Sequence, residues 1–189
     1  MGEVKEMLKI VIPKMELFDE KAEEFITIKE TELQLEHSLI SLAKWERKWH
    51  KPFLYKKEEK TIEEIQDYIR CMTLTKGVDP MIYKYIPASV LKQIFDYIDD
   101  PMTATWFSNT EEKKSGMKKE IITNEIIYYW MISLGIPVQF EKWHLNSLIT
   151  LIRVVNVKNA PSKKMSKKEI LAQNARINAA RRAKHKTKG

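Results

Sequence analysis

Histidine and cysteine are the side chains that most often serve as bases, nucleophiles or metal ligands, and this chain contains few of them. The four histidines, His37, His50, His144 and His185, show no metal-ligand spacing with one another or with carboxylates. Cys71 is the single cysteine, which excludes a disulfide framework and a thiolate zinc site within one chain. It lies inside an apolar helical pattern, which is typical of a buried small hydrophobe. We therefore expect no bound metal and a reducing, cytosolic setting.

Two polar residues fall within strongly apolar segments. For His144, a core histidine hydrogen-bonded to a neighbour is favoured over a catalytic base. A guanidinium near a core should be paired, so Arg153 is expected to have a structural partner among Asp67, Asp96 and Glu125. The chain has neither a glycine-rich phosphate loop nor a Gly-x-Ser-x-Gly nucleophile elbow. We predict that the protein is not an enzyme and uses no cofactor.

Aromatic and basic residues gather on the first predicted helix. Trp45 and Trp49 are four residues apart and so lie one above the other on a helix surface. The structural interpretation is that both bury against the sheet, and the functional one is that an indole face contacts a partner, since Trp and Arg are enriched at binding hot spots. The candidate partner-binding residues are Trp45, Arg47, Trp49 and Trp106.

The net charge of +7 is distributed unevenly along the chain. Residues 163–189 contain ten Lys or Arg against one acid, Glu169, and so carry +9, which leaves −2 for residues 1–162. A near-neutral body with a basic end indicates that the end seeks an acidic partner. The basic tail residues include Lys163, Lys164, Lys167, Lys168, Arg176, Arg181 and Arg182.

The first 36 residues alternate apolar and polar side chains with a period near two. This pattern predicts three short strands, at about 8–12, 25–28 and 32–36, with a turn at 19–21. Three strands with one apolar face are only marginally stable alone. We therefore expect a small antiparallel sheet that packs against the helices that follow.

Capping residues mark the starts of the helices. Ser38 or His37 opens the first helix, Thr61 and Glu64 form a capping box, and Asp79 precedes a proline at a first helical position. The predicted helices cover 38 to about 50, 62 to about 74, a short one through 85, and 88–99. Between residues 109 and 119 the chain is polar and charged, and we expect a loop there.

Residues 123–156 are predicted to form a helical hairpin. Thr123 caps its first helix, and Gly135 ends that helix. The second helix is expected to begin near Phe140, and it is apolar over more than half its circumference. Such a helix is typically buried, so we predict that it is the central core helix.

The final segment is expected to be a basic helix from Lys167 to about Ala183, opened by a capping box at Ser166 and Glu169. The predicted fold is α+β and mainly α-helical: a small N-terminal antiparallel β-sheet, a helical bundle and a basic C-terminal helix. Residues 1–162 are expected to form one globular domain, β-rich over 1–36 and helical over 37–162, followed by the tail 163–189. No run of about 18 apolar residues is present, and the N-terminus does not resemble a signal peptide, so neither a membrane span nor secretion is predicted.

Seven phrases of the sequence resemble, as a set, one family of proteins from the structural gene modules of long-tailed bacteriophages, the tail assembly chaperones. The resemblance covers roughly residues 7 to 182. The phrases are LEHSL at 35–39, KWERKWHKPFL at 44–54, DYIRCMTL at 67–74, PMTATWF at 101–107, IYYWMI at 127–132, KWHLN at 142–146, and LIR through KNAP at 151–161.

This resemblance implies a non-catalytic protein of the infected host cytoplasm. Such a protein binds the long helical tape measure protein, keeps it soluble and helps tail tube subunits to assemble around it. The resemblance assigns a binding role to no individual residue of this chain. Two alternatives stay open: a virion structural protein such as a head-to-tail joining component, and nucleic-acid binding through the basic tail.

Overall fold

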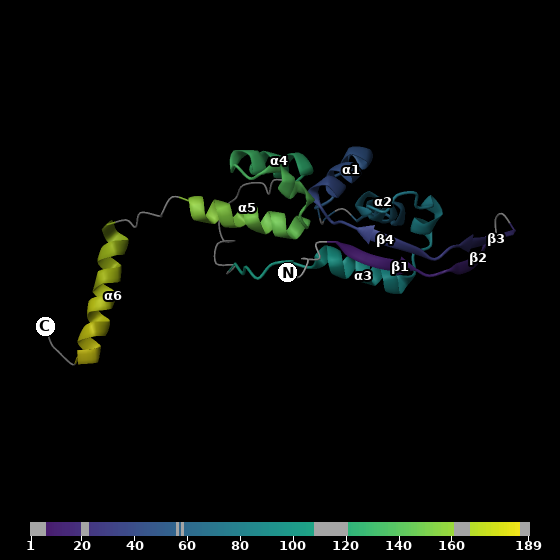
Figure 1. Cartoon of the computed structure of the whole chain (residues 1–189). Coiled ribbons are helices and arrows are strands. Elements are labelled where there is room, and N and C mark those ends of the chain that lie inside the picture. Colours follow the sequence, from purple (N-terminus) through teal and green to yellow (C-terminus); the bar gives the residue numbers. More distant parts are fainter. Residues whose placement is uncertain are drawn as a thin grey trace, which may run out of the picture. The chain divides into compact units, whose positions relative to one another are not determined.

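The computed structural model describes residues 7–19, 23–55, 57, 59–107, 121–160 and 167–185. The chain divides into two compact units, residues 1–156 and residues 157–189. The first unit holds the strands and most of the helices, and the second holds the end of α5 and the C-terminal helix α6 (Figure 1). The fold is α+β and mainly α-helical, as predicted.

In the described ranges four strands, rather than the predicted three, form two antiparallel two-stranded sheets. β1 (Leu8–Ile12) pairs with β4 (Thr31–Leu35), and β2 (Met15–Asp19) pairs with β3 (Glu24–Ile28). The prediction missed β2 because Pro13, which has no N–H for a ladder, ends the first apolar run only two residues earlier. The expected turn at 19–21 falls largely on residues outside the described ranges.

The capping signals placed the first helices correctly. Ser38 caps α1 (Leu39–Trp49), and its hydroxyl accepts a hydrogen bond from the Ser41 N–H. Thr61 and Glu64 form the predicted capping box of α2 (Ile62–Met72). Asp79 caps η1 (Pro80–Lys84), a 3-10 helix, and α3 (Ala88–Asp99) has its predicted bounds.

The predicted helical hairpin is present, but its second helix begins later than expected. α4 (Asn124–Ser133) ends in a Schellman motif, in which Gly135 has φ +66° and the Ile136 N–H donates to the Met131 carbonyl at 2.8 Å. The 3-10 helix η2 (Val138–Lys142) follows, and α5 spans Leu145–Asn159. The extended backbone of Trp143 separates η2 from α5 and so delays the start of the second helix.

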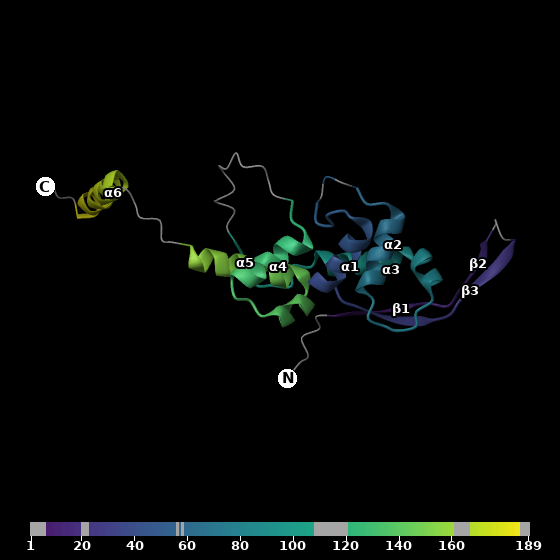
Figure 2. The same ribbon diagram turned by 90° about the horizontal axis from the view of Figure 1, so that it is seen from above.

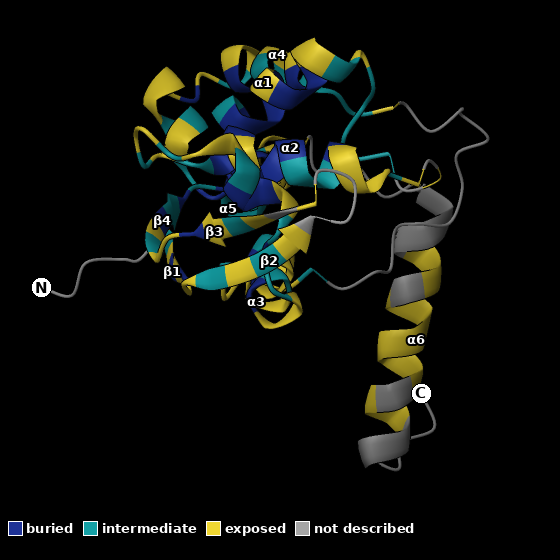
Figure 3. Ribbon diagram, turned by 90° about the vertical axis from the view of Figure 1, so that its right-hand side faces the viewer, coloured by how far each residue is buried: buried dark blue, intermediate teal, exposed yellow. Residues whose placement is uncertain are grey.

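The larger hydrophobic core lies between the strands and α1, α2, η1 and α3. Figure 1 shows α2 on one side of β1 and β4 and α3 on the other, and Figure 3 shows the buried residues between them. α1, α4 and α5 lie side by side in both views (Figure 1 and Figure 2), and they supply most of the smaller core. Its members are Leu39, Leu42, Ile127, Met131, Ile136, Leu145, Leu148 and Ile152.

The prediction that the second hairpin helix is the central core helix was wrong. α5 buries only Leu145, Leu148 and Ile152, whereas α1 contributes to both cores. Arg153 was also misplaced. It is exposed, and its guanidinium stacks on the Phe107 ring at 4.1 Å instead of pairing with a carboxylate near the core.

In the second unit, α6 (Lys167–His185) confirms the predicted C-terminal helix and extends two residues past its expected end. The expected loop at 109–119 and the capping residue Ser166 lie outside the described residues, as do Lys163 and Lys164. Within the described ranges, no helix combines the length and apolar character that a bilayer crossing requires.

Candidate protein-binding surface

α4 carries seven consecutive apolar residues, from Ile126 to Ile132, and one side of the helix cannot hide them all. Ile127 and Met131 are buried in the smaller core. On the outer side Tyr129 is 67% exposed and Ile132 is 74% exposed. A helix that is apolar all round is normally covered on every side. α4 therefore presents an apolar stripe that no element of the described part of the chain covers.

η2 extends this stripe. The Tyr128 hydroxyl donates a hydrogen bond of 2.8 Å to the Glu141 carboxylate, which holds η2 beside α4. Residues three apart share one side of a 3-10 helix, so Val138 lies on the same side of η2 as Glu141, and it is 58% exposed. We call the surface formed by Tyr128, Tyr129, Ile132 and Val138 the apolar face.

Burial and the bond to Glu141 raise the pKa of Tyr128 to about 12. The phenol therefore stays protonated at neutral pH and keeps its role as a donor. The Phe140 and Trp143 rings, which flank this region in sequence, stack with centroids 4.1 Å apart. The Trp143 N–H also donates to the Phe140 carbonyl at 3.0 Å, so a backbone hydrogen bond joins the same two residues at the end of η2.

A buried carboxylate fixes α4 against α1. Glu46 is only 6% exposed, and its two oxygens accept three hydrogen bonds of 2.7 to 2.8 Å. The donors are the Phe53 N–H and the backbone and side-chain N–H groups of Asn124. Because the first N–H groups of a helix lack intrahelical partners, Glu46 satisfies the start of α4 and sets its position.

The apolar face has a polar border at the N-terminal end of α4. There, a hollow of about 420 Å³ is lined by residues that include Arg47, His50, Glu46 and Glu125. Glu125 accepts hydrogen bonds from its own backbone N–H and from the Thr123 hydroxyl, and these lower its pKa. Thr123 therefore sits at the predicted cap position but bonds a side chain rather than the helix backbone. Arg47 is exposed beside this hollow.

The two tryptophans that sequence analysis singled out lie largely inside the molecule. Trp45 is 1% exposed, and its indole N–H donates to the Glu64 carbonyl at 2.8 Å. Trp45 is thus a core residue, which is the structural interpretation. Trp49 is half-buried, and its N–H donates to Asp67 at 2.8 Å.

Asp67 collects three donors, from Lys48, Trp49 and Arg70. Burial alone would raise its pKa, but these hydrogen bonds and the charge of Arg70 outweigh burial and lower it. Both Trp49 and the cations beside it are therefore held in a structural cluster that joins α1 to α2.

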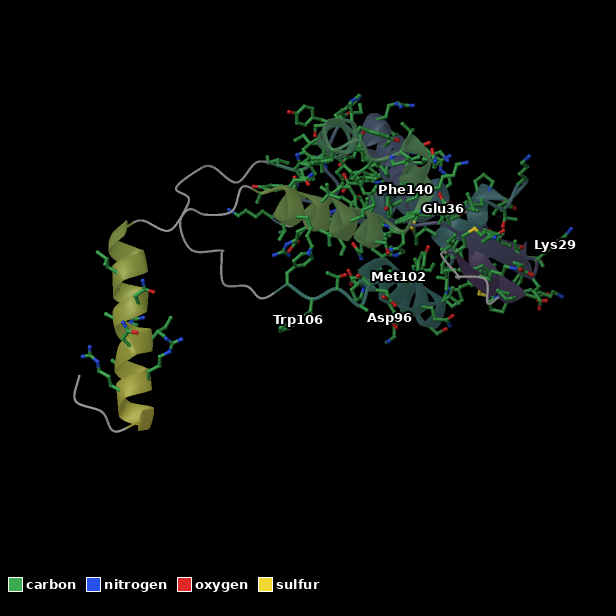
Figure 4. All side chains as sticks on the ribbon, turned by 60° about the vertical axis from the view of Figure 1, so that its left-hand side comes forward. Lys29, Glu36, Asp96, Met102, Trp106 and Phe140 are labelled. Carbon is green, nitrogen blue, oxygen red and sulfur yellow. The ribbon has the colours of Figure 1, made fainter. Side chains whose placement is uncertain are left out.

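The other predicted site residues lie elsewhere. Trp106 is 91% exposed on the segment after α3, and Figure 4 shows it well apart from Phe140 of η2. Arg176, Arg181 and Arg182 are exposed on α6 in the second unit. Lys167 and Lys168 begin the same helix.

The buried histidines form a structural joint. The Tyr68 hydroxyl and His37 Nδ1 are 2.6 Å apart, and His144 Nε2 lies 3.0 Å from the Tyr97 carbonyl oxygen. Both rings are almost fully buried, so His144 is a hydrogen-bonded core histidine, as predicted. Cys71 is buried too, and burial raises the pKa of its thiol.

Buried polar groups in the described part of the chain are satisfied internally. No buried side-chain nitrogen or oxygen there lacks a hydrogen-bond partner, and no group of three His, Cys, Asp or Glu residues has the geometry of a metal site. The hydrogen bonds of these buried polar side chains therefore help to hold the fold together.

Sequence reasoning missed the apolar face although a signal for it was present. Seven apolar residues in succession exceed what one buried side of a helix accommodates.

Comparison with family models, with curated proteins and with solved structures found no match for this chain.

Proposed function

We propose that this chain is a non-catalytic tail assembly chaperone of a long-tailed bacteriophage. In this proposal, the apolar face binds the tape measure protein in the host cytoplasm, keeps it soluble and helps tail tube subunits to assemble around it. The identity of the partner comes from the resemblance of the seven sequence phrases. The observation that carries a protein-binding function is the exposure of Tyr129 and Ile132 on α4 and of Val138 on η2, which the hydrogen bond from Tyr128 to Glu141 holds beside α4.

The chemistry of the apolar face suits a helical partner. An amphipathic helix is recognised by laying its apolar stripe against an apolar groove or surface, and contiguous exposed apolar residues typically mark such contacts. Tyrosine is also among the residues enriched at binding hot spots. A long, largely helical tape measure protein would offer many stripes of this kind.

The contacts that hold α4 in place favour binding of a partner without a change in the conformation of α4. Ile127 and Met131 anchor it in the smaller core, Glu46 holds its N-terminus, and Glu141 ties Tyr128 to η2. A preorganised surface loses less conformational entropy on binding than a mobile one does. This rigidity supports a surface built for recognition.

The internal use of the polar side chains supports the non-catalytic part of the proposal. His37 and His144, which would be the candidates for proton transfer, each hold structural hydrogen bonds in the buried interior. A catalytic base needs access to its substrate.

The test is capture of the tape measure protein from cells that express the tail genes together with the tagged chain. Nuclease treatment and a wash at about 0.5 M salt remove partners held only by charge. We expect the tape measure protein to be retained by the wild-type chain and released by the double variant Tyr129→Asp, Ile132→Asp.

The matched control is Phe18→Asp, Phe25→Asp, which places the same charges on another exposed apolar pair, on β2 and β3. This control should retain the tape measure protein. Equal retention by both double variants would remove the apolar face from the proposal. Presence of the chain in purified mature particles would favour the structural-protein alternative instead.

A further inference from the structure

The second unit has a charge and a form that the apolar face does not explain. α6 is a 19-residue helix with six Lys or Arg and one Glu. At 1.5 Å per residue it is about 28 Å long. It belongs to a segment, residues 163–189, that carries +9 while residues 1–162 carry −2.

The described side chains of α6 form no buried or continuous apolar face. Every residue of α6 whose side chain is described is exposed, including its larger apolar residues Leu171 and Ile177. A helix turns by about 100° per residue, so Arg176, Arg181 and Arg182 point in different directions around the axis. The helix is therefore cationic on all sides rather than amphipathic.

We infer that α6 is a binding element for double-stranded nucleic acid, which acts through the phosphate backbone and independently of the apolar face. This inference does not rest on the chaperone function. It follows from the density of cations and from their distribution around an exposed helix.

Contacts with phosphates require only cations that are distributed around an exposed helix. Double-stranded DNA carries one negative charge per about 1.7 Å of its axis, and each phosphate that Lys or Arg neutralises releases a counterion. The resulting affinity is independent of sequence and falls steeply with salt. A helix about 28 Å long with cations on every side can contact these regularly spaced phosphates in many orientations.

Other partners fit α6 less well. A helix that lies in a membrane interface needs a strong apolar face opposite its basic one, and a helix that docks in a protein groove needs apolar anchors at helical spacing. Stacking on single strands needs aromatic side chains, and residues 163–189 contain no Phe, Trp or Tyr. Duplex phosphate, which needs neither an apolar face nor aromatic side chains, is the chemistry that these residues fit best.

The experiment measures binding of the full-length chain to a fluorescent DNA duplex of about 30 base pairs, long enough to span α6 several times over, by anisotropy over a series of salt concentrations. In the test variant, Arg176→Gln, Arg181→Gln and Arg182→Gln are combined. Glutamine is about as good a helix former as arginine, and circular dichroism checks that helix content is kept. The control combines Lys9→Gln, Lys29→Gln and Lys76→Gln, which removes the same charge from exposed positions of the first unit.

We expect the wild-type chain to bind with a strong salt dependence. The arginine variant should bind about tenfold more weakly, or weaker still, at about 0.1 M salt. The slope of log affinity against log salt should become shallower by about 0.9 for each phosphate that the variant no longer neutralises. The lysine control should bind within about twofold of wild type.

Three results would overturn the inference. They are equal weakening by the two triple variants, no DNA binding even at low salt, and tighter binding to vesicles containing phosphatidylserine than to DNA. The capture of the tape measure protein is scored separately at the apolar face, so failure of either proposal leaves the other standing.

Discussion

The rings of His37 and His144 meet edge-on in the core, with their centroids 5.0 Å apart. His37 lies where the chain leaves β4, and His144 lies where the chain enters α5. The backbone connects the same two places, because the Leu145 N–H donates to the His37 carbonyl at 2.8 Å. Two imidazoles this close and this deeply buried are compatible only with neutral rings. The joint between the two cores is thus built on uncharged histidines.

This pairing predicts a loss of stability in mild acid. Burial, and secondarily the charge of His144, lower the pKa of His37 from 6.5 to about 3, and burial also lowers the pKa of His144. Below pH 6.5 the unfolded chain binds a proton on His37 and the folded chain does not, so the free energy of unfolding falls as the pH drops toward 3. The expected slope from His37 is about 1.4 kcal/mol per pH unit, and the lowered pKa of His144 changes stability in the same direction.

Urea denaturation at about pH 7.5 and about pH 5, on either side of the ordinary histidine pKa, measures this loss. The exposed-histidine variant His50→Gln should show the same loss as wild type. Histidine NMR signals that titrate near the ordinary value of about 6.5 for both His37 and His144 would contradict the assignment.

Glu46→Gln should destabilise the protein by about 1 to 3 kcal/mol. The carboxylate accepts hydrogen bonds on both oxygens, and the amide NH₂ that replaces one of them would face a donor, either at Phe53 or at Asn124. Chemical denaturation of this variant and of Glu63→Gln, an exposed position on α2, gives the comparison. Equal stabilities would mean that Glu46 does not organise the start of α4.

Leu148→Ala and Ile152→Ala should each lower the free energy of unfolding by about 2 to 5 kcal/mol. Both side chains are buried in the smaller core, so truncation leaves a cavity there. The exposed Ile132→Ala serves as the matched control and should change stability by less than about 0.5 kcal/mol. Thermal melts that place all three variants together would contradict the described core.

Ending the chain after Ser162 should leave the melting temperature of the first unit nearly unchanged. The deletion removes α6, whose described side chains are all exposed, and it keeps the whole of α5. Scanning calorimetry of the full and shortened chains provides the measurement. A large drop in melting temperature would show that the tail contributes to the stability of the folded body.

Part of the fold follows from residues that are close together in the chain. Ser38 begins α1, the Thr61 and Glu64 box begins α2, and Gly135 ends α4, because each of these signals acts through hydrogen bonds or backbone angles within a few residues. The mainly α-helical α+β class and the concentration of positive charge in the tail could also be predicted from the sequence alone.

The tertiary structure decided which apolar residues are covered. Trp45 is buried and Tyr129 is exposed, although each lies in an apolar helical pattern, because α1 lies between two cores and α4 borders only one. The role of Glu46 also depends on a partner 78 residues away, at Asn124. Periodicity indicates that a helix has an apolar side, whereas long-range packing determines whether another element covers it.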